Sequence, residues 1–193
     1  MIAQALSNAL TLGENSSAGT EHDRMRSSSA GLFVIPLMAC AQSSGGDLPP
    51  TVAAAVASLA EVCTAAEGKP LTDDAVRVAD LNGDAVDDFV VYAGWMVCEN
   101  AWSVFGDREK ILMVYAGDGR GGAPEAYVDS VFDAAIETTP EGSALWLGVM
   151  AEACGRPSAE TFAEETFCNR AVVWNATTRK LEYAPLGTIR LIE

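Results

Sequence analysis

One amphipathic stripe near the start of the folded part predicts a single helix. Between Thr51 and Glu67, apolar residues recur at helical spacing, and alanine, the best helix former, fills most other positions. Thr51 is a candidate N-cap, and Gly68 and Pro70 end the segment. The pattern therefore predicts a helix over residues 51–67. Its inward stripe consists of Val52, Val56, Leu59 and Cys63.

Beyond Lys69, short runs rich in Val, Ile, Tyr and Trp alternate with turns that contain Gly, Asp or Pro. Asp118-Gly119 within Gly117–Gly122 predicts a hairpin loop. A phosphate loop is the weaker interpretation of these glycines, because no Lys-Ser or Lys-Thr follows them. The predicted fold class is α+β: one N-terminal helix packed on an antiparallel β-meander and stapled by disulfides. The expected strands lie near residues 75–79, 88–93, 110–116, 125–131, 143–150, 170–175 and 180–184.

The polar and apolar pattern before the helix is typical of an export leader. Met25-Arg26 precedes the apolar run Leu32–Ala39, which is too short to span a bilayer because that needs about 20 apolar residues. We therefore expect four segments along the chain. These are an upstream extension at 1–24, a signal peptide and lipobox region at 25–41, a flexible tether at 42–50, and a single α+β domain at 51–193.

Two modes of processing fit the end of the leader. Leu37-Met38-Ala39-Cys40 resembles the bacterial lipobox, in which Cys40 is acylated and becomes the mature N-terminus. Ala39-Cys40-Ala41 also fits cleavage by ordinary signal peptidase. The Ser- and Gly-rich tether that follows favours the lipoprotein. We expect an exported protein, either periplasmic or an outer-membrane lipoprotein, which contacts a membrane only through a lipid anchor at Cys40.

Export changes the interpretation of the remaining cysteines. Cys63, Cys98, Cys154 and Cys168 form an even number in an oxidising compartment, where three connectivities are possible. Cys154 and Cys168 flank a polar loop, so we pair them, and Cys63 then pairs with Cys98. The disulfide Cys63–Cys98 would staple the helix to the sheet. No CxxC spacing indicates zinc or redox chemistry.

Composition excludes several classes of function. The 193 residues include 12 basic and 27 acidic ones, and the resulting net charge of −15 argues against binding nucleic acid or anionic lipid. The single histidine, His22, lies in the upstream extension ahead of the signal peptide, so the mature chain could not build a Ser-His-Asp triad, a Cys-His pair or a histidine zinc site. Carboxylate chemistry and binding of hard cations by oxygen remain.

Residues 80–88 carry oxygen-bearing side chains at alternate positions of a tight turn. Positions 1, 3, 5 and 9 are Asp80, Asn82, Asp84 and Asp88, and the carbonyl of Val86 at position 7 adds a fifth oxygen. Calcium takes six to eight oxygens, and a divalent ion would relieve the repulsion among three carboxylates. The loop therefore predicts a weak, structural Ca²⁺ site, with an acidic turn as the alternative.

This sequence motif resembles the calcium loop of FG-GAP and VCBS repeats, whose consensus is roughly D-x-N-x-D-G-x-x-D. The resemblance implies side-chain ligation at the four polar positions and carbonyl ligation by Val86. Ala85 stands where those loops have glycine, and Val91 where an EF-hand has its bidentate glutamate, so the expected affinity is low. The order of cysteines around the loop also resembles small exported bacterial proteins, a resemblance that brings no activity with it.

Three hypotheses for function follow. The first is a non-enzymatic envelope module that binds an envelope protein or a glycan. The second is a carboxylate-dependent glycan hydrolase, because such enzymes need only two carboxyl groups. The third is an acidic inhibitor of a basic envelope-directed enzyme such as lysozyme, since ten basic and 24 acidic residues from Gln42 onward leave a net charge of −14. The candidate hydrolase carboxylates are Glu152, Glu160, Glu164 and Glu165.

Four tryptophans bear on sugar binding. Trp146 and Trp174 lie in predicted strands, where aromatic residues usually belong to a core, so we expect them to be buried. Trp95 and Trp102 flank Cys98 in a less regular stretch and are the better candidates for an exposed surface.

Overall fold

A computed structural model describes residues 48–140 and 142–192 of the chain. These residues belong to the second of two compact units, Ser43–Glu193. The upstream extension with His22 and the leader with the lipidation candidate Cys40 lie outside the described residues, so their predictions stay predictions. Within the described part, no helix combines the length and the apolar character that a membrane span requires.

The predicted helix forms as α1 (Pro50–Ala65), and its whole inward stripe is buried. The expected N-cap is wrong. The N-cap is Pro49, Pro50 occupies the first turn where a missing N–H costs nothing, and the hydroxyl of Thr51 instead donates to the Ala123 carbonyl at 2.7 Å. The helix also ends two residues early, because Glu67 adopts a left-handed backbone (φ +60°).

All seven predicted strands are present, each within three residues of its expected ends. Four short or polar strands were not predicted: β1 (Lys69–Leu71), β4 (Val97–Glu99), β7 (Asp133–Thr139) and β11 (Arg190–Leu191). The predicted ones are β2 (Val76–Ala79), β3 (Asp88–Tyr92), β5 (Lys110–Tyr115), β6 (Glu125–Val131), β8 (Gly142–Met150), β9 (Phe167–Asn175) and β10 (Lys180–Tyr183).

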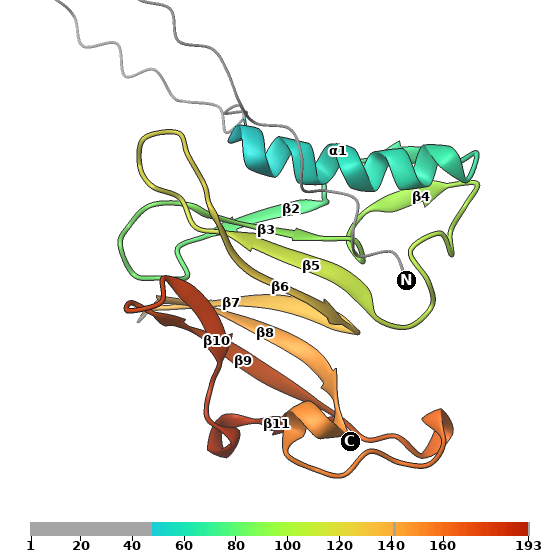
Figure 1. The fold of residues 1–193 in the computed structure, drawn as a ribbon, viewed down its shortest axis with the longest axis vertical. Helices are drawn as coiled ribbons and strands as arrows, with labels where there is room; N and C mark the ends of the chain where they lie inside the picture. The colour runs from blue at the N-terminus through green and yellow to red at the C-terminus, as the bar shows by residue number, and fades with distance from the viewer. Residues whose placement is uncertain (1–47, 141, 193) are drawn as a thin grey trace, which may run out of the picture. The chain divides into compact units, whose positions relative to one another are not determined.

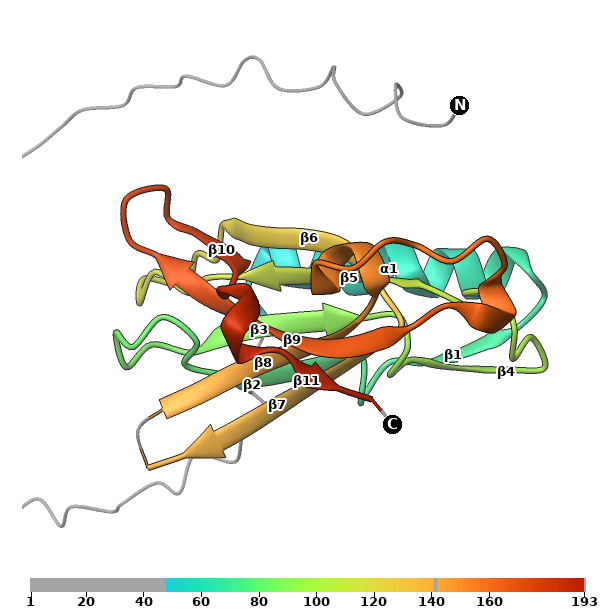
Figure 2. The same cartoon turned by 90° about the horizontal axis from the view of Figure 1, so that it is seen from below.

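The α+β class is confirmed, but the strands form two antiparallel sheets and a small ribbon. The first sheet has the order β2-β3-β5-β6, and the second has the order β10-β9-β8-β7 with β11 beside β9. The ribbon pairs β1 with β4. Helix α1 covers one face of the first sheet, and the second sheet packs on the other face (Figure 1). Viewed from below, the strands of the two sheets cross obliquely (Figure 2).

Strand β3 lies in the middle layer and is buried on both faces. Val90 and Tyr92 point into the core between the two sheets, whereas Val91 and the following Ala93 face α1. This explains why its sequence reads as a continuous apolar run and not as an alternation. The layer order is therefore helix, sheet, sheet, with a separate hydrophobic cluster in each gap.

Both predicted disulfides are confirmed. Cys63–Cys98, with Cα atoms 5.8 Å apart, joins α1 to β4 of the ribbon and not to the main sheet. Cys154–Cys168, with Cα atoms 6.1 Å apart, joins the 3-10 turn η1 (Ala151–Cys154) to β9. Gly68 is required beside the first bond, because a Cβ there would collide with the Cys98 sulfur.

Candidate functional site

The acidic loop of residues 80–87 connects β2 to β3 at one end of the first sheet. It lies beside the β5–β6 hairpin loop (Figure 1), and the two loops touch closely. Gly117 of the hairpin has no room for a Cβ, which would collide with the Asp87 carbonyl. A glycine at this position therefore allows the hairpin to approach the acidic loop.

Side chains of the loop hold its backbone through N–H bonds. Asp80 accepts the Gly83 N–H through Oδ1 at 2.7 Å and the Ala85 N–H through Oδ2 at 2.9 Å. Ala85 adopts a left-handed backbone (φ +62°), the conformation for which the resembling loops use glycine. The folded protein therefore keeps, at Ala85, the backbone conformation of a glycine position, and an alanine there carries strain.

The next two polar residues follow the same scheme. Asn82 Oδ1 accepts the N–H of Asp84 at 2.9 Å, and Asp84 Oδ1 accepts the N–H of Val86 at 2.8 Å. Both are local turns in which a short polar side chain bonds the backbone two residues on. Asp84 Oδ2 receives no hydrogen bond from the described residues.

Asp88 is the buried end of the loop, with only 1% of its surface exposed. Its Oδ2 accepts the Leu81 N–H at 2.8 Å, and its Oδ1 accepts the Gly117 N–H at 3.0 Å. Burial raises the pKa of Asp88; the two N–H bonds oppose this, while the charges of Asp84 and Asp80 add to it. Asp88 thus clamps the acidic loop to the hairpin and carries an electrostatic cost.

The pKa of Asp80 shifts in the opposite direction to that of Asp88. The slight burial of Asp80 acts to raise the pKa, but the N–H bonds from Ala85 and Gly83 outweigh that effect and leave the pKa below its usual value. The carboxylate is therefore ionised at neutral pH. The two ion pairs in the described part of the chain both lie elsewhere, so no lysine or arginine there neutralises the loop.

The donor set of the loop matches a hard cation in kind, with three carboxylates, an amide oxygen and a carbonyl. Among the described residues, however, no three His, Cys, Asp or Glu side chains are placed together as a metal cage. The carboxylates are directed first at backbone N–H groups. Each bonded oxygen keeps a second lone pair for another partner.

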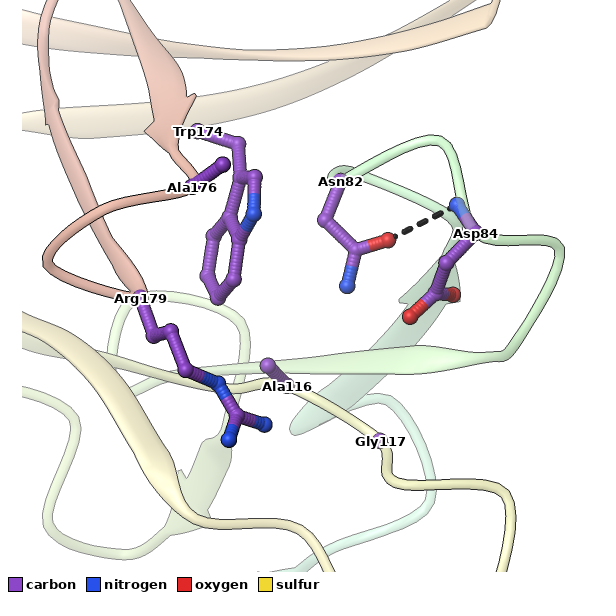
Figure 3. A pocket seen from close by; sticks show the side chains of 7 residues that line it. All are labelled: Asn82, Asp84, Ala116, Gly117, Trp174, Ala176 and Arg179. Carbon is purple, nitrogen blue, oxygen red and sulfur yellow. Dashed lines mark hydrogen bonds between the residues drawn. The ribbon is translucent and has the colours of Figure 1, made fainter.

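A cleft of about 250 Å³ opens between this loop and the β9–β10 turn. Trp174 and Asn82 face each other across it, with the indole nitrogen on the side of Asn82, and Arg179 reaches beneath them toward Ala116 (Figure 3). Asp84 lies at the outer edge of the cleft. The cleft thus combines an indole, a guanidinium, a carboxamide and a carboxylate from segments about 90 residues apart in sequence.

Asn175 shapes the β9–β10 turn that carries Arg179. Its Oδ1 accepts the N–H groups of Thr177 and Thr178 at 2.9 and 3.2 Å, and its carbonyl accepts the Arg179 N–H at 2.8 Å. Arg179 takes a left-handed backbone (φ +54°) to close the turn. The cleft was missed at the level of sequence, because the packing of the second sheet on the first brings this turn beside the acidic loop.

The candidate hydrolase carboxylates do not gather in one place. Glu165 accepts the N–H groups of Ala151 and Ala159 at 3.3 and 3.2 Å and so holds the loop beyond η1. Glu164 accepts the Thr161 hydroxyl at 3.0 Å. Glu152 lines a different cleft, of about 320 Å³, together with two carboxylates that the sequence did not single out, Glu109 and Asp129.

Three of the four tryptophans differ in burial from expectation. Trp102 is 77% exposed, as predicted for its irregular stretch. Trp146 and Trp174 are half-buried and not fully buried. Trp146 lies on the outer face of the second sheet beneath the guanidinium of Arg190 at 3.6 Å, and Trp174 lines the cleft. Trp95 is also half-buried, since it packs against the inter-sheet core beneath the guanidinium of Arg77 at 4.0 Å.

The likeness to FG-GAP and VCBS loops rests on the sequence motif of residues 80–88. The backbone at Ala85 is compatible with it. Comparisons with models of protein families, with curated proteins and with solved structures found no match.

Proposed function

We propose that this protein is an exported envelope module that works by binding and not by turnover, and that its acidic loop takes up one Ca²⁺ as a structural ion. The ligands would be the side-chain oxygens of Asp80, Asn82, Asp84 and Asp88 and the carbonyl of Val86. Water completes the shell, because the loop supplies five or six oxygens and calcium takes six to eight.

The observation that carries the proposal is the unneutralised charge of a pre-shaped loop. Four carboxylates lie within nine residues, one of them buried, and no basic side chain of the described residues pairs with them. The charges of Asp80 and Asp84 already raise the pKa of Asp88. A divalent cation would remove this repulsion at the junction of two loops.

Calcium titration by calorimetry tests the proposal directly. Chelator-treated protein is expected to bind one Ca²⁺ with a Kd of about 10⁻⁴–10⁻³ M, the range of extracellular modules, and Mg²⁺ is expected to compete poorly. The double variant Asp80→Asn/Asp84→Asn should lose the binding heat. Absence of binding up to about 10 mM calcium would leave the loop as an acidic turn.

One observation favours a second candidate function, a carboxylate-dependent glycan hydrolase. Glu109, Asp129 and Glu152 line a common cleft, and glycosidases need two carboxyl groups. Asp129 is held there by the hydroxyls of Tyr127 and Tyr183 at 2.8 and 2.7 Å. Release of dye from chromogenic glycosides, abolished by Glu152→Gln, would establish turnover and displace the binding role.

A further inference from the structure

We infer that the cleft between the acidic loop and the β9–β10 turn binds a carboxylate-bearing sugar, such as a terminal uronic acid of an acidic glycan. This inference rests on the proposed binding function and gives it a ligand class. The cleft is defined by Asn82, Asp84, Trp174 and Arg179 (Figure 3). Ala116 and Gly117 form its floor.

The size of the cleft limits the ligand. Pockets for drug-sized molecules hold roughly 300–1,000 Å³, and this one holds about 250 Å³. It is also open to solvent along the exposed side chains of Asp84 and Arg179. These properties suit one ring at the end of a longer chain.

Hydrogen-bonding capacity in the cleft is weighted toward donors. The Arg179 guanidinium makes no hydrogen bond or ion pair with other described residues, so all its donors face solvent or a ligand. The amide nitrogen of Asn82 is also available, because only its oxygen bonds to the Asp84 N–H. The indole nitrogen of Trp174 lies on the same side (Figure 3).

Three donor groups, one of them charged, favour an anionic oxygen group, and a guanidinium matches a carboxylate in a bidentate manner. The cleft also offers an acceptor, because Asp84 Oδ2 receives no hydrogen bond from the described residues. A hydroxyl group can both donate and accept, so it can satisfy Asp84 and Asn82 together. A uronic acid carries both the carboxylate and the hydroxyls.

Trp174 supplies the apolar surface that a sugar ring requires. It is half-buried and packs against the core between the sheets, so its position is fixed before any ligand arrives. An anchored aromatic side chain costs little ordering entropy on binding. Screening over about 8 Å at physiological salt weakens the repulsion from distant carboxylates. Asp84 lies in the cleft itself and lowers the affinity for an anion.

The test is a calorimetric titration with methyl β-glucuronide, methyl β-galacturonide and, as the neutral control, methyl β-glucoside. At least one uronide is expected to bind with a Kd of about 1–10 mM, a value suited to a single small ring, and at least tenfold more tightly than the glucoside. Equal binding of uronides and glucoside, or no binding of any of the three, would overturn the inference.

Variants locate the binding. Arg179→Gln, an exposed change with no partner to lose, should weaken uronide binding at least tenfold, whereas Arg156→Gln, an exposed arginine outside the cleft, should not. Trp174→Phe keeps a ring in the core but removes the indole N–H, and should also weaken binding. Trp102→Ala removes an exposed tryptophan elsewhere and is the matched control. Loss of uronide binding in either control variant would contradict the assignment of the sugar to this cleft.

Titrations in EDTA and in millimolar calcium separate this inference from the calcium proposal. Uronide binding is expected in EDTA, where the shared side chains of Asn82 and Asp84 are free for the sugar. In calcium it is expected to be retained through Arg179 and Trp174, which are not calcium ligands. If calcium binds but uronides do not, only the sugar inference fails. If uronides bind in EDTA and calcium has no measurable affinity, only the calcium proposal fails.

Discussion

At the scale of single residues, the acidic loop is controlled by two positions with opposite energetic character. Ala85 keeps a left-handed backbone that glycine would adopt without strain, so it costs stability. Asp88 is buried and accepts two N–H groups from two different loops, so it holds them together. Each property predicts the effect of one substitution.

Ala85→Gly is expected to stabilise the protein by about 1 kcal/mol, because the strain at φ +62° disappears, less the extra entropy of glycine in the unfolded chain. Urea unfolding in EDTA measures this. Ala57→Gly, at an exposed position inside α1, is the control and should cost about 1 kcal/mol. A loss of stability at position 85 would mean that the left-handed backbone is not kept.

Asp88→Asn is expected to destabilise by about 1–3 kcal/mol even without calcium. An asparagine has one acceptor oxygen, so its NH₂ group would face either the Leu81 or the Gly117 N–H in a buried site. The neighbouring exposed change Asp87→Asn should be nearly neutral. Equal stability of the two variants in urea would show that Asp88 does not clamp the loops.

At the scale of elements, the helix and the strands that face a core were predictable from sequence, whereas the short strands and the edge strand were not. The stripe of α1 and the apolar runs of β3, β5 and β8 carry strong periodic signals, because each faces a core. Strand β7, with the sequence DAAIETT, is a largely exposed edge strand and lacks such a signal. Strands β1 and β4 have three residues each and depend on pairing with one another.

The same reasoning explains how much of the candidate site was accessible from sequence. Alternate polar positions between Asp80 and Asp88 could be identified, since the whole loop is contiguous. The Asp88–Gly117 bond and the cleft with Trp174 and Arg179 depend on contacts between distant segments. Pairing of β3 with β5 brings Asp88 to Gly117, and packing of the two sheets brings the β9–β10 turn to the acidic loop. One sequence encodes neither of these arrangements locally.

The disulfides make distinct contributions that follow from the loops they close. Cys63–Cys98 spans 35 residues and Cys154–Cys168 spans 14, so the chain-entropy model predicts losses of about 4 and about 3 kcal/mol for the paired alanine variants. Chemical unfolding of Cys63→Ala/Cys98→Ala and Cys154→Ala/Cys168→Ala checks both values. If neither paired variant loses stability against unfolding, the disulfides do not staple the fold.

At the scale of the whole molecule, the three layers bury all four tyrosines of the chain at least partly. Burial raises the pKa of Tyr92 and of Tyr183 to about 12, and it also raises the pKa values of Tyr115 and Tyr127. The folded state therefore prefers the neutral phenols. This contribution to stability is fully present below pH 10 and is lost as the pH rises from about 10 toward 12.

Absorbance at 295 nm during an alkaline titration tests this prediction. The native protein should show little tyrosine ionisation near pH 10, and the signal should rise together with the loss of near-UV circular dichroism. Protein unfolded in urea is the control and should titrate near pH 10. Native tyrosines that titrate near pH 10 before unfolding would contradict the packing of Tyr127 and Tyr183 between the layers.

The central proposal, a structural calcium ion on the acidic loop, is tested most directly by thermal melting in EDTA and in millimolar calcium. For the wild type, linkage predicts a stabilisation of about 0.5–1.5 kcal/mol, a Tm increase of a few degrees. The exposed control Asp73→Asn/Asp74→Asn should keep this increase, and Asp80→Asn/Asp84→Asn should lose it while remaining folded. If calcium raises the Tm of neither the wild type nor the Asp80→Asn/Asp84→Asn variant, the loop is an acidic turn and the proposal is wrong.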